Sequence, residues 1–182
     1  MKTLVIVSHP YPEQSLTIKA LQAVAEEGAD VEVRNLEALY GSDLSSFDVA
    51  AEQQAHQGVD RVVYLFPVHW FNLTPMLKAY LNQVWAYGWA FGPNGTALKG
   101  KEMLVVVTAG AAEHTYSDAG LVQSAIDEVL TPMKASALYV GMRYAKPLAF
   151  FEAMAASTEK LADFSTAFMN SLAAPLGSRV QS

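Results

Sequence analysis

The chain has 182 residues, of which 52% are hydrophobic and 16% are charged, and it contains no cysteine. This length fits one domain with a full core, and the apolar content excludes a disordered protein. The lack of cysteine excludes disulfide scaffolds, cysteine nucleophiles, thiolate zinc sites and iron–sulfur clusters, and we expect no metal site. Twelve basic and eighteen acidic residues give a net charge of −6, so nucleic acid is not an expected partner.

Short, β-branched and apolar runs predict strands that are buried on both faces. Four of them are TLVIVS at 3–8, VEVRNL at 31–36, RVVYLFP at 61–67 and EMLVVVT at 102–108. A shorter run, ALYVG at 137–141, predicts a fifth strand. Continuous apolar strands that alternate with helices are typical of a parallel sheet, because helices then cover both of its faces.

Helical periodicity occupies the intervals between these strands. We expect one helix near Ile18, others over 49–57 and 121–133, and a last one over 152–172 that follows a loop at 146–147. The clearest pattern is an apolar stripe with the spacing of one helix face: Leu73, Met76, Leu77, Tyr80, Leu81, Val84 and Trp85.

Five alternations of strand and helix predict the α/β class, with a three-layer, doubly wound, five-stranded parallel sheet of flavodoxin-like strand order 2-1-3-4-5. We expect one domain over residues 1–175 and a frayed tail over 176–182. The short apolar runs and the lack of a signal-peptide pattern favour a soluble cytoplasmic protein. Ligands of this architecture bind beyond the carboxyl ends of the strands, so the loops after the first, third and fourth strands are the candidate binding loops.

The first of these loops runs from His9 to Ser15 and leads into a helix whose first N–H groups and positive dipole end suit a phosphate group. Ser15 and Thr17 add hydroxyl groups, and His9 could add another donor or a partial positive charge. The loop is neither G-x-G-x-x-G nor a P-loop, which argues against a dinucleotide pyrophosphate or a nucleoside triphosphate. The alternative is that Ser15 only caps the helix and His9 is a turn residue.

The second and third loops suggest a flat ligand. Trp70 and Phe71 stand together after a strand, where large rings suit a planar aromatic guest, although both could instead pack beneath the loop. The third loop, from Thr108 to Ala112, has small residues that let backbone amides approach a ligand closely. A phosphate site, an aromatic wall and an amide-lined edge together describe a site for FMN. FAD is the less favoured alternative, because the short chain has no extra segment for adenine.

Three segments resemble the flavodoxin-like NAD(P)H:quinone oxidoreductases. They are SHPYPEQSLTIKAL, FPVHWFNLTPMLKAYLNQVWAYGWAFGPNGTALKGK and VVVTAGAAEHTYS. The chain is most similar to the small bacterial branch that includes the ancillary subunits of glutathione-gated potassium-efflux systems. The resemblance covers nearly the whole chain. Its middle segment is highly specific, because an aromatic pair, a proline, a lysine eight residues past the tryptophan and a G-W-A-F-G turn occur together.

The resemblance implies three groups of cofactor contacts when it is carried over position by position. Phosphate and ribityl contacts fall on His9, Ser15, Leu16, Thr17 and Ile18. Isoalloxazine contacts fall on Val68, His69, Trp70 and Phe71, with Pro67 shaping the turn. Contacts to the pyrimidine and N5 edge fall on Thr108, Ala109, Gly110 and Ala111.

A catalytic role is implied for Tyr116, which could donate a proton to the departing hydroquinone oxygen. His114 is a candidate helper, although an exposed loop histidine is more often simply solvated. The histidine that assists this tyrosine in the animal enzymes has no counterpart, because Val122 stands at that spacing.

Other positions depart from the family pattern. The alanines of the third loop replace residues that are usually threonine or glycine, so their backbone must avoid positive φ or accept strain. His69 stands where glutamine is common, and Thr74 stands where proline is common.

The implied reaction is a ping-pong, two-electron reduction in which NAD(P)H and then a quinone use the same slot on the flavin. Such homologues are homodimers, and Trp89 and Phe91 are candidates to reach into the neighbouring subunit's site and bind substrate. The alternative is that both pack within their own subunit. Two other functions stay open. One is regulation of a potassium-efflux antiporter, which would bring the protein to the inner membrane, and the other is electron transfer like that of a flavodoxin.

Overall fold

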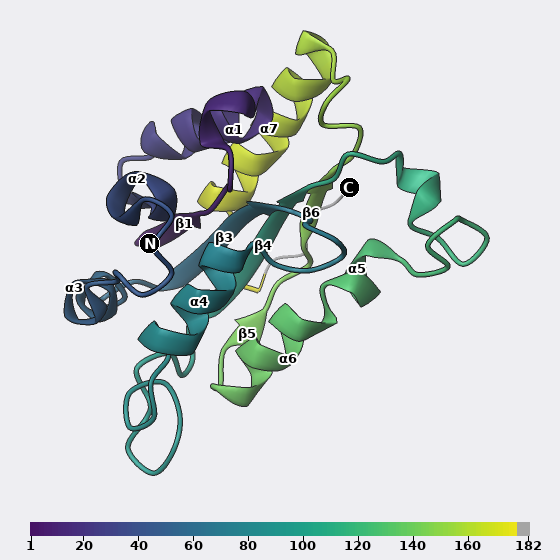
Figure 1. Cartoon of the computed structure of the whole chain (residues 1–182). Helices are drawn as coiled ribbons and strands as arrows, with labels where there is room; N and C mark the ends of the chain where they lie inside the picture. The colour runs from purple at the N-terminus through teal and green to yellow at the C-terminus, as the bar shows by residue number, and fades with distance from the viewer. Residues whose placement is uncertain (178–182) are drawn as a thin grey trace.

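A twisted parallel sheet runs through the centre of the molecule, and the computed structural model describes it within residues 1–177 (Figure 1). The strand order is 2-1-3-4-5, as predicted, and the α/β class is confirmed. The last position is shared by two short strands that both pair with the fourth. The strands are β1 (Thr3–Val7), β2 (Val31–Asn35), β3 (Arg61–Pro67), β4 (Glu102–Thr108), β5 (Arg143–Tyr144) and β6 (Leu148–Phe150).

Alternate strand residues point to opposite faces, so the sheet has two cores. Val5 and Val7 of β1 pack with α1 (Leu16–Glu26) and α7 (Thr158–Ala173) on one face. Leu4 and Ile6 belong to the larger core on the other face, which also takes side chains from four helices. These are α2 (Leu36–Tyr40), α3 (Val49–Ala55), α4 (Pro75–Val84) and α6 (Thr131–Tyr139). Figure 1 shows the resulting three layers.

The remaining elements are short: η1 (Pro12–Gln14), η2 (Glu113–Thr115) and α5 (Ile126–Val129). The apolar stripe of the fourth helix is confirmed, since its members from Met76 to Trp85 are buried in the larger core. Within residues 1–177, no helix combines the length and the hydropathy needed to cross a bilayer.

The predicted strand at 137–141 is wrong. Ala137 to Tyr139 form the last turn of α6, and Gly141 follows that helix with a φ of 77°. A short apolar run suits either a strand or a helix, and here Pro132 begins a helix that continues through it. The edge of the sheet is formed further along the chain by β5 and β6. They flank the predicted loop at Pro147, which has no N–H group to pair with β4.

The predicted helix over 121–133 is wrong in its first half, because residues 121–125 are not helical. Gln123 has a φ of 51°, which a right-handed helix excludes. Two short helices, α5 and α6, follow instead of one.

The last helix begins at Thr158 rather than at Glu152, since Ser157 caps it by accepting the N–H of Lys160 at 3.1 Å. Glu152 itself has a φ of 59° and belongs to a loop after β6. Near the chain end, Gly177 donates its N–H to the Glu102 carboxylate at 2.6 Å. Residues 178–182 of the predicted tail lie outside the described residues.

Candidate functional site

A cavity of about 480 Å³ opens at the carboxyl edge of the sheet, where ligands of this architecture bind. Its walls come from the three predicted loops and from one further segment after β6. The lining residues are His9, Tyr11, Gln14, Ser15, Leu16, Pro67, Val68, Thr108, Gly110, Ala153 and Met154. The fold therefore brings all three predicted loops to one cavity.

The first loop offers neutral hydrogen-bond donors. Ser15 caps α1, because its hydroxyl oxygen accepts the N–H of Ile18 at 3.2 Å. The N–H groups of Leu16 and Thr17 have no acceptor within the helix, so they can serve an anion at the positive end of the helix dipole. The Thr17 hydroxyl donates to the backbone oxygen of Ala153 at 3.2 Å and thereby ties the loop to the segment after β6.

His9 adds an imidazole to the same wall. Its Nδ1 accepts the N–H of Tyr11 at 2.9 Å, which leaves the proton of the neutral ring on Nε2. Burial lowers the pKa of His9, and the nearby His69 acts in the same direction. The structure therefore favours a neutral donor over a positive charge. Ile18 does not face the cavity, because its side chain is buried in the core and its N–H donates to Ser15.

Two lysines near this wall are already paired with carboxylates. Lys19 lies 2.8 Å from Glu13, and Lys160 lies 2.8 Å from Glu152. Each lysine lowers the pKa of its glutamate by hydrogen bonding and by charge. A phosphate in this cavity would therefore meet helix amides and a neutral imidazole before it met a free cation.

The second loop is a tight turn that presents its aromatic residues outward. His69 and Asn72 exchange backbone hydrogen bonds of 2.9 and 3.1 Å, and the residues between them, Trp70 and Phe71, have φ values of 49° and 62°. This is the pattern of a type I′ turn, which normally requires asparagine or glycine. Trp70 is 87% exposed and Phe71 is 46% exposed, so neither packs beneath the loop.

Backbone strain at such a turn costs on the order of 1–3 kcal/mol for each residue and is typical of functional sites. The turn holds the large Trp70 ring in solvent at the rim of the cavity. In this position the ring does not contribute to core packing. A flat ligand that stacks on this ring would offset the cost.

The third loop has the small-residue surface that was predicted. Positive φ occurs at four non-glycine residues among 1–177, and none of them is an alanine, so the loop alanines avoid strain. The N–H of Ala109 is used within the protein, since it donates to the backbone oxygen of Phe150 at 2.8 Å. Gly110 lines the cavity, and a Cβ at this residue would project into open space. This wall therefore leaves room for the edge of a ligand.

The segment after β6 forms a fourth wall that the sequence analysis missed. Ala153 donates its N–H to Ala109 at 3.0 Å, and Glu152 donates its N–H to Ala111 at 3.1 Å. Because the sequence predicts a helix that begins at Glu152, it does not predict this loop. The signal that could have revealed it is Ser157, a good helix cap that stands immediately before the true start of α7.

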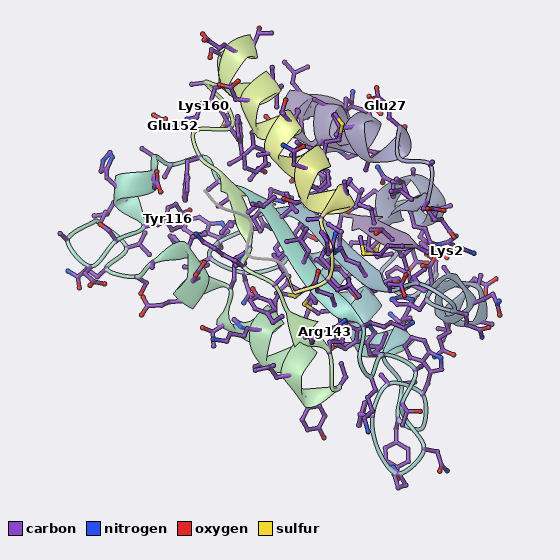
Figure 2. All side chains as sticks on the ribbon, turned by 180° about the vertical axis from the view of Figure 1, so that it is seen from behind. Lys2, Glu27, Tyr116, Arg143, Glu152 and Lys160 are labelled. Carbon is purple, nitrogen blue, oxygen red and sulfur yellow. The ribbon has the colours of Figure 1, made fainter. Side chains whose placement is uncertain are left out.

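Tyr116 stands beside the second and fourth walls. Its ring lies 6.3 Å from that of Phe71 and 5.6 Å from that of Phe151, between centroids. Burial raises the pKa of Tyr116. Figure 2 shows Tyr116 toward the same end of the molecule as Glu152 and Lys160, away from Lys2. His114 precedes it on η2 and is exposed.

Trp89 and Phe91 do not line the cavity. They follow α4, which returns the chain to the amino edge of the sheet. Trp89 contacts the His56 ring edge-on at 5.5 Å, and Phe91 lies 5.8 Å from Tyr87 and 5.9 Å from Tyr139. In a single chain both residues pack within their own subunit, and a contact with a neighbour's site stays a prediction.

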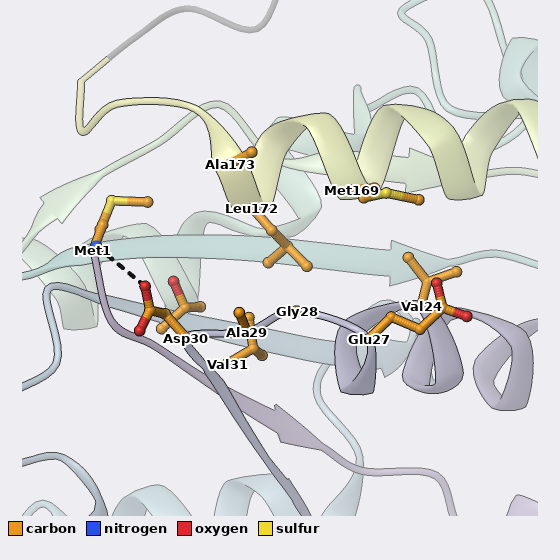
Figure 3. A pocket seen from close by; sticks show the side chains of 11 residues that line it. Met1, Val24, Glu27, Gly28, Ala29, Asp30, Val31, Met169, Leu172 and Ala173 are labelled. Carbon is orange, nitrogen blue, oxygen red and sulfur yellow. Dashed lines mark ion pairs between the residues drawn. The ribbon is translucent and has the colours of Figure 1, made fainter.

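A second cavity of about 400 Å³ lies at the amino edge, between α7 and the turn that follows α1 (Figure 3). Its walls include aliphatic side chains from both elements, such as Val24 and Leu172. The N-terminal ammonium group of Met1 lies 3.8 Å from Asp30 at this cavity. None of the predicted site residues lines it, so the cavity at the carboxyl edge is the candidate functional site.

The fold agrees with a comparison to known families. The model of the Flavodoxin_2 family, described as a flavodoxin-like fold, matches residues 1–172. The chain belongs to this family. Among curated proteins it is 37% identical over 163 residues to the uncharacterized NAD(P)H oxidoreductase YdeQ of Bacillus subtilis, which covers 90% of this chain and 82% of the relative.

Solved structures of the same fold carry several names. General stress protein 14 of Treponema denticola, in complex with FMN, has a TM-score of 0.85 and 36% identity over 94% of this chain and 99% of that chain. An NADPH-quinone reductase of P. pentosaceus has a TM-score of 0.86 and 26% identity over 97% and 100%. A chain from Streptomycin violaceusniger described as a tryptophan halogenase has a TM-score of 0.90 and 36% identity over 95% and 99%.

The residues around the cavity fit FMN. The first-turn amides of α1 and the His9 Nε2–H suit its phosphate and ribityl oxygens. The open space at Gly110 admits the edge of a flat ring, and the exposed Trp70, two residues after Val68 of the cavity wall, offers an apolar face. The hydrogen-bond donors are neutral and the aromatic side chain is flat. Such a site suits a flavin better than it suits a metal ion or a nucleoside triphosphate.

Proposed function

We propose that this chain is an FMN-dependent NAD(P)H oxidoreductase that reduces quinones or similar flat acceptors by two electrons. The observation that carries the proposal is one cavity lined by the start of α1, by Pro67 and Val68 just before the strained aromatic turn, and by Gly110. The relative named as an NAD(P)H oxidoreductase, the neighbour with bound FMN and the neighbour named as a quinone reductase support it. FMN, when bound, supplies the hydride chemistry, and the protein supplies position and electrostatics.

The residues of the chain divide the binding task between them. The amides of Leu16 and Thr17 and the imidazole of His9 would hold the phosphate and ribityl end. Trp70 and Phe71 would present a flat apolar surface to the ring system and to whichever substrate lies against it. One slot of this kind admits the nicotinamide and the acceptor only in turn, which is the basis for the proposed ping-pong order.

Tyr116 is the proposed proton donor to the oxygen of the reduced acceptor. Because burial raises its pKa, the phenol keeps its proton at neutral pH and can donate it. Contacts with Phe71 and Phe151 hold its ring at the rim. His114 lies two residues away on the surface and is the lesser candidate, as a helper that holds or passes a proton.

A homodimer is the proposed assembly, with Trp89 and Phe91 of one subunit at the substrate site of the other. Apolar side chains crowd the rim of the cavity, and Leu16 and Met154 are 79% and 94% exposed. Exposed apolar patches of this kind usually mark interaction surfaces. A mass measurement by light scattering, with the Phe91→Ala variant beside the wild type, tests this part of the proposal.

The decisive experiment is the absorption spectrum and mass of the copurified cofactor, recorded before and after NADPH is added. A flavin spectrum, the mass of FMN and bleaching by NADPH are expected. Colourless protein that does not bind added FMN at micromolar concentration would remove the proposal. Titration also separates an electron carrier, which should accumulate a one-electron reduced flavin, from an oxidoreductase, which should not. Unchanged potassium efflux after gene deletion would remove the antiporter alternative.

The Tyr116→Phe variant tests the proton donor. Turnover with a quinone should fall by about 10²-fold, the usual contribution of a general acid, while FMN stays bound. Stopped-flow measurement of the two half-reactions should place the loss in acceptor reduction. Equal turnover in the variant would assign Tyr116 to packing alone.

A further inference from the structure

A series of side-chain hydrogen bonds connects two walls of the candidate site beneath the cavity. Ser8, which follows β1, is fully buried, and its hydroxyl donates to the Glu37 carboxylate at 2.8 Å. The Ser8 hydroxyl also lies 2.5 Å from that of Thr74, which is equally buried. Thr74 caps α4, because its hydroxyl oxygen accepts the N–H of Leu77 at 3.2 Å.

The number of hydroxyl protons determines which group donates in each of these hydrogen bonds. Ser8 has one hydroxyl proton, and the carboxylate of Glu37 takes it, so Thr74 must donate in the contact between the two hydroxyls. The order is therefore Leu77 N–H to Thr74, Thr74 to Ser8 and Ser8 to Glu37.

Glu37 is half-buried, and it differs from the two buried acids within residues 1–177. Glu52 is paired with Arg34 at 2.6 Å, and Glu102 is paired with Arg61 at 2.7 Å. Within residues 1–177 no cation pairs with Glu37, and one of its carboxylate oxygens is buried without a hydrogen-bond partner.

The surroundings of Glu37 are instead the loops of the candidate site. Burial raises the pKa of Glu37, and hydrogen bonds from the Ser8 hydroxyl and the His9 backbone N–H oppose that rise. A carboxyl group in the first turn of α2 suits the helix dipole, but Glu37 has no ion pair there among the described residues. Its hydrogen-bond donors belong to the residues that begin the phosphate wall.

The two ends of this series of hydrogen bonds lie in different walls of the site. Ser8 immediately precedes His9 on the phosphate wall, and Thr74 follows the aromatic turn that carries Trp70 and Phe71. These walls leave the sheet from different strands, β1 and β3. A shift of the Glu37 carboxyl group would therefore move one wall relative to the other.

We propose that Glu37 is a positioning residue of this site, which acts through Ser8 and Thr74 to set the spacing between the phosphate wall and the aromatic turn. This inference rests on the proposed function, because the ligand that spans the two walls is FMN. It assigns no contact between Glu37 and the cofactor. It predicts that the chain of hydrogen bonds affects FMN affinity more than it affects folding.

The test is a double-mutant cycle on the whole protein, with FMN added to the flavin-free form and binding followed by fluorescence. Glu37→Gln and Thr74→Val should each weaken FMN binding about fivefold, the effect of one hydrogen bond. The double variant should be weakened about as much as the weaker-binding single variant, because both changes break the same chain. Thr74→Ser keeps the hydroxyl and should restore wild-type affinity.

Thr3→Val is the matched control, since Thr3 is a buried threonine at the opposite edge of the sheet, and its FMN affinity should equal that of the wild type. Thermal midpoints of the flavin-free proteins separate a positioning role from a structural one. If Thr74→Val unfolds, Ser8→Ala replaces it in the cycle. Wild-type affinity in Glu37→Gln, or multiplied effects in the double variant, would overturn the inference and leave the proposed function intact. A wild type that binds no FMN overturns both.

Discussion

The amino and carboxyl edges of the sheet differ in how their polar groups are satisfied. At the amino edge, Arg61 and Glu102 form a buried ion pair, and Arg61 also donates to three backbone oxygens at the end of α7: those of Ser171, Leu172 and Ala174. At the carboxyl edge, the two ion pairs near the cavity are exposed and Glu37 has no cation partner within residues 1–177, and three loop residues adopt positive φ: Trp70, Phe71 and Glu152.

The difference shows how one fold separates stability from binding. The ion pair at the amino edge joins β3 and β4, and the hydrogen bonds of Arg61 add α7, which packs on one face of the sheet. The carboxyl edge can then carry strained backbone and exposed rings, because the strands beneath it are held elsewhere. Proteins commonly place such costs at functional sites.

The largest expected effect breaks the amino edge. Arg61→Met leaves Glu102 buried without its cation and should lower the free energy of unfolding by about 3–5 kcal/mol. Urea denaturation measures the loss, and FMN affinity of the folded variant should be unchanged. Adding Glu102→Leu should recover most of the stability. A loss below about 1 kcal/mol would show that the ion pair does not stabilise this edge.

Relieving strain at the carboxyl edge should have the opposite consequence. Trp70→Gly suits a φ of 49°, so the unfolding free energy of the flavin-free protein should stay level or rise by up to about 1 kcal/mol. Loss of the ring should weaken FMN binding about tenfold.

Trp70→Ala is the control for this change, because it removes the ring and keeps the strain. It should weaken FMN binding equally without the gain in stability. Wild-type affinity in both variants would mean that the exposed ring does not contact the cofactor.

A smaller effect is a pH dependence of the unfolding free energy that arises from a histidine at the amino edge. Burial lowers the pKa of His56 to about 4, whereas the unfolded chain titrates near its usual value of about 6.5. The unfolded state therefore binds a proton that the folded state refuses, and stability falls as the pH drops below about 6.5. Between pH 7 and pH 5.5 the loss should be about 1 kcal/mol.

Urea denaturation at these two pH values measures that loss. His56→Asn, which keeps a donor near the Glu52 backbone oxygen, should remove it. Glu37 contributes in the opposite direction, since its raised pKa lets the folded state keep a proton longer as the pH rises. If the His56→Asn variant still loses stability between pH 7 and pH 5.5, the pH dependence belongs to other groups.

The sequence predicted most of the sheet and the edge at which the cavity opens. Runs such as 62–66 and 103–107 are apolar throughout, and such runs between helices are typical of a buried parallel strand. Ser15 marks the start of α1 by its own chemistry, because its hydroxyl caps the helix. The loops after these strands then had to meet at one edge, where the cavity is found.

Tertiary structure decided the features that depend on contacts between distant residues. Residues 137–139 are helical, and β4 pairs with β5 and β6 instead, an outcome that the local sequence does not determine. Trp70 and Phe71 accept positive φ because the ends of β3 and α4 hold the turn closed. The link from Glu37 to Ser8 and Thr74 joins residues 29 and 66 positions apart. Apolar periodicity and capping act over a few residues and can be read locally, whereas strand choice, backbone strain and buried networks depend on energies that arise only after the chain has folded.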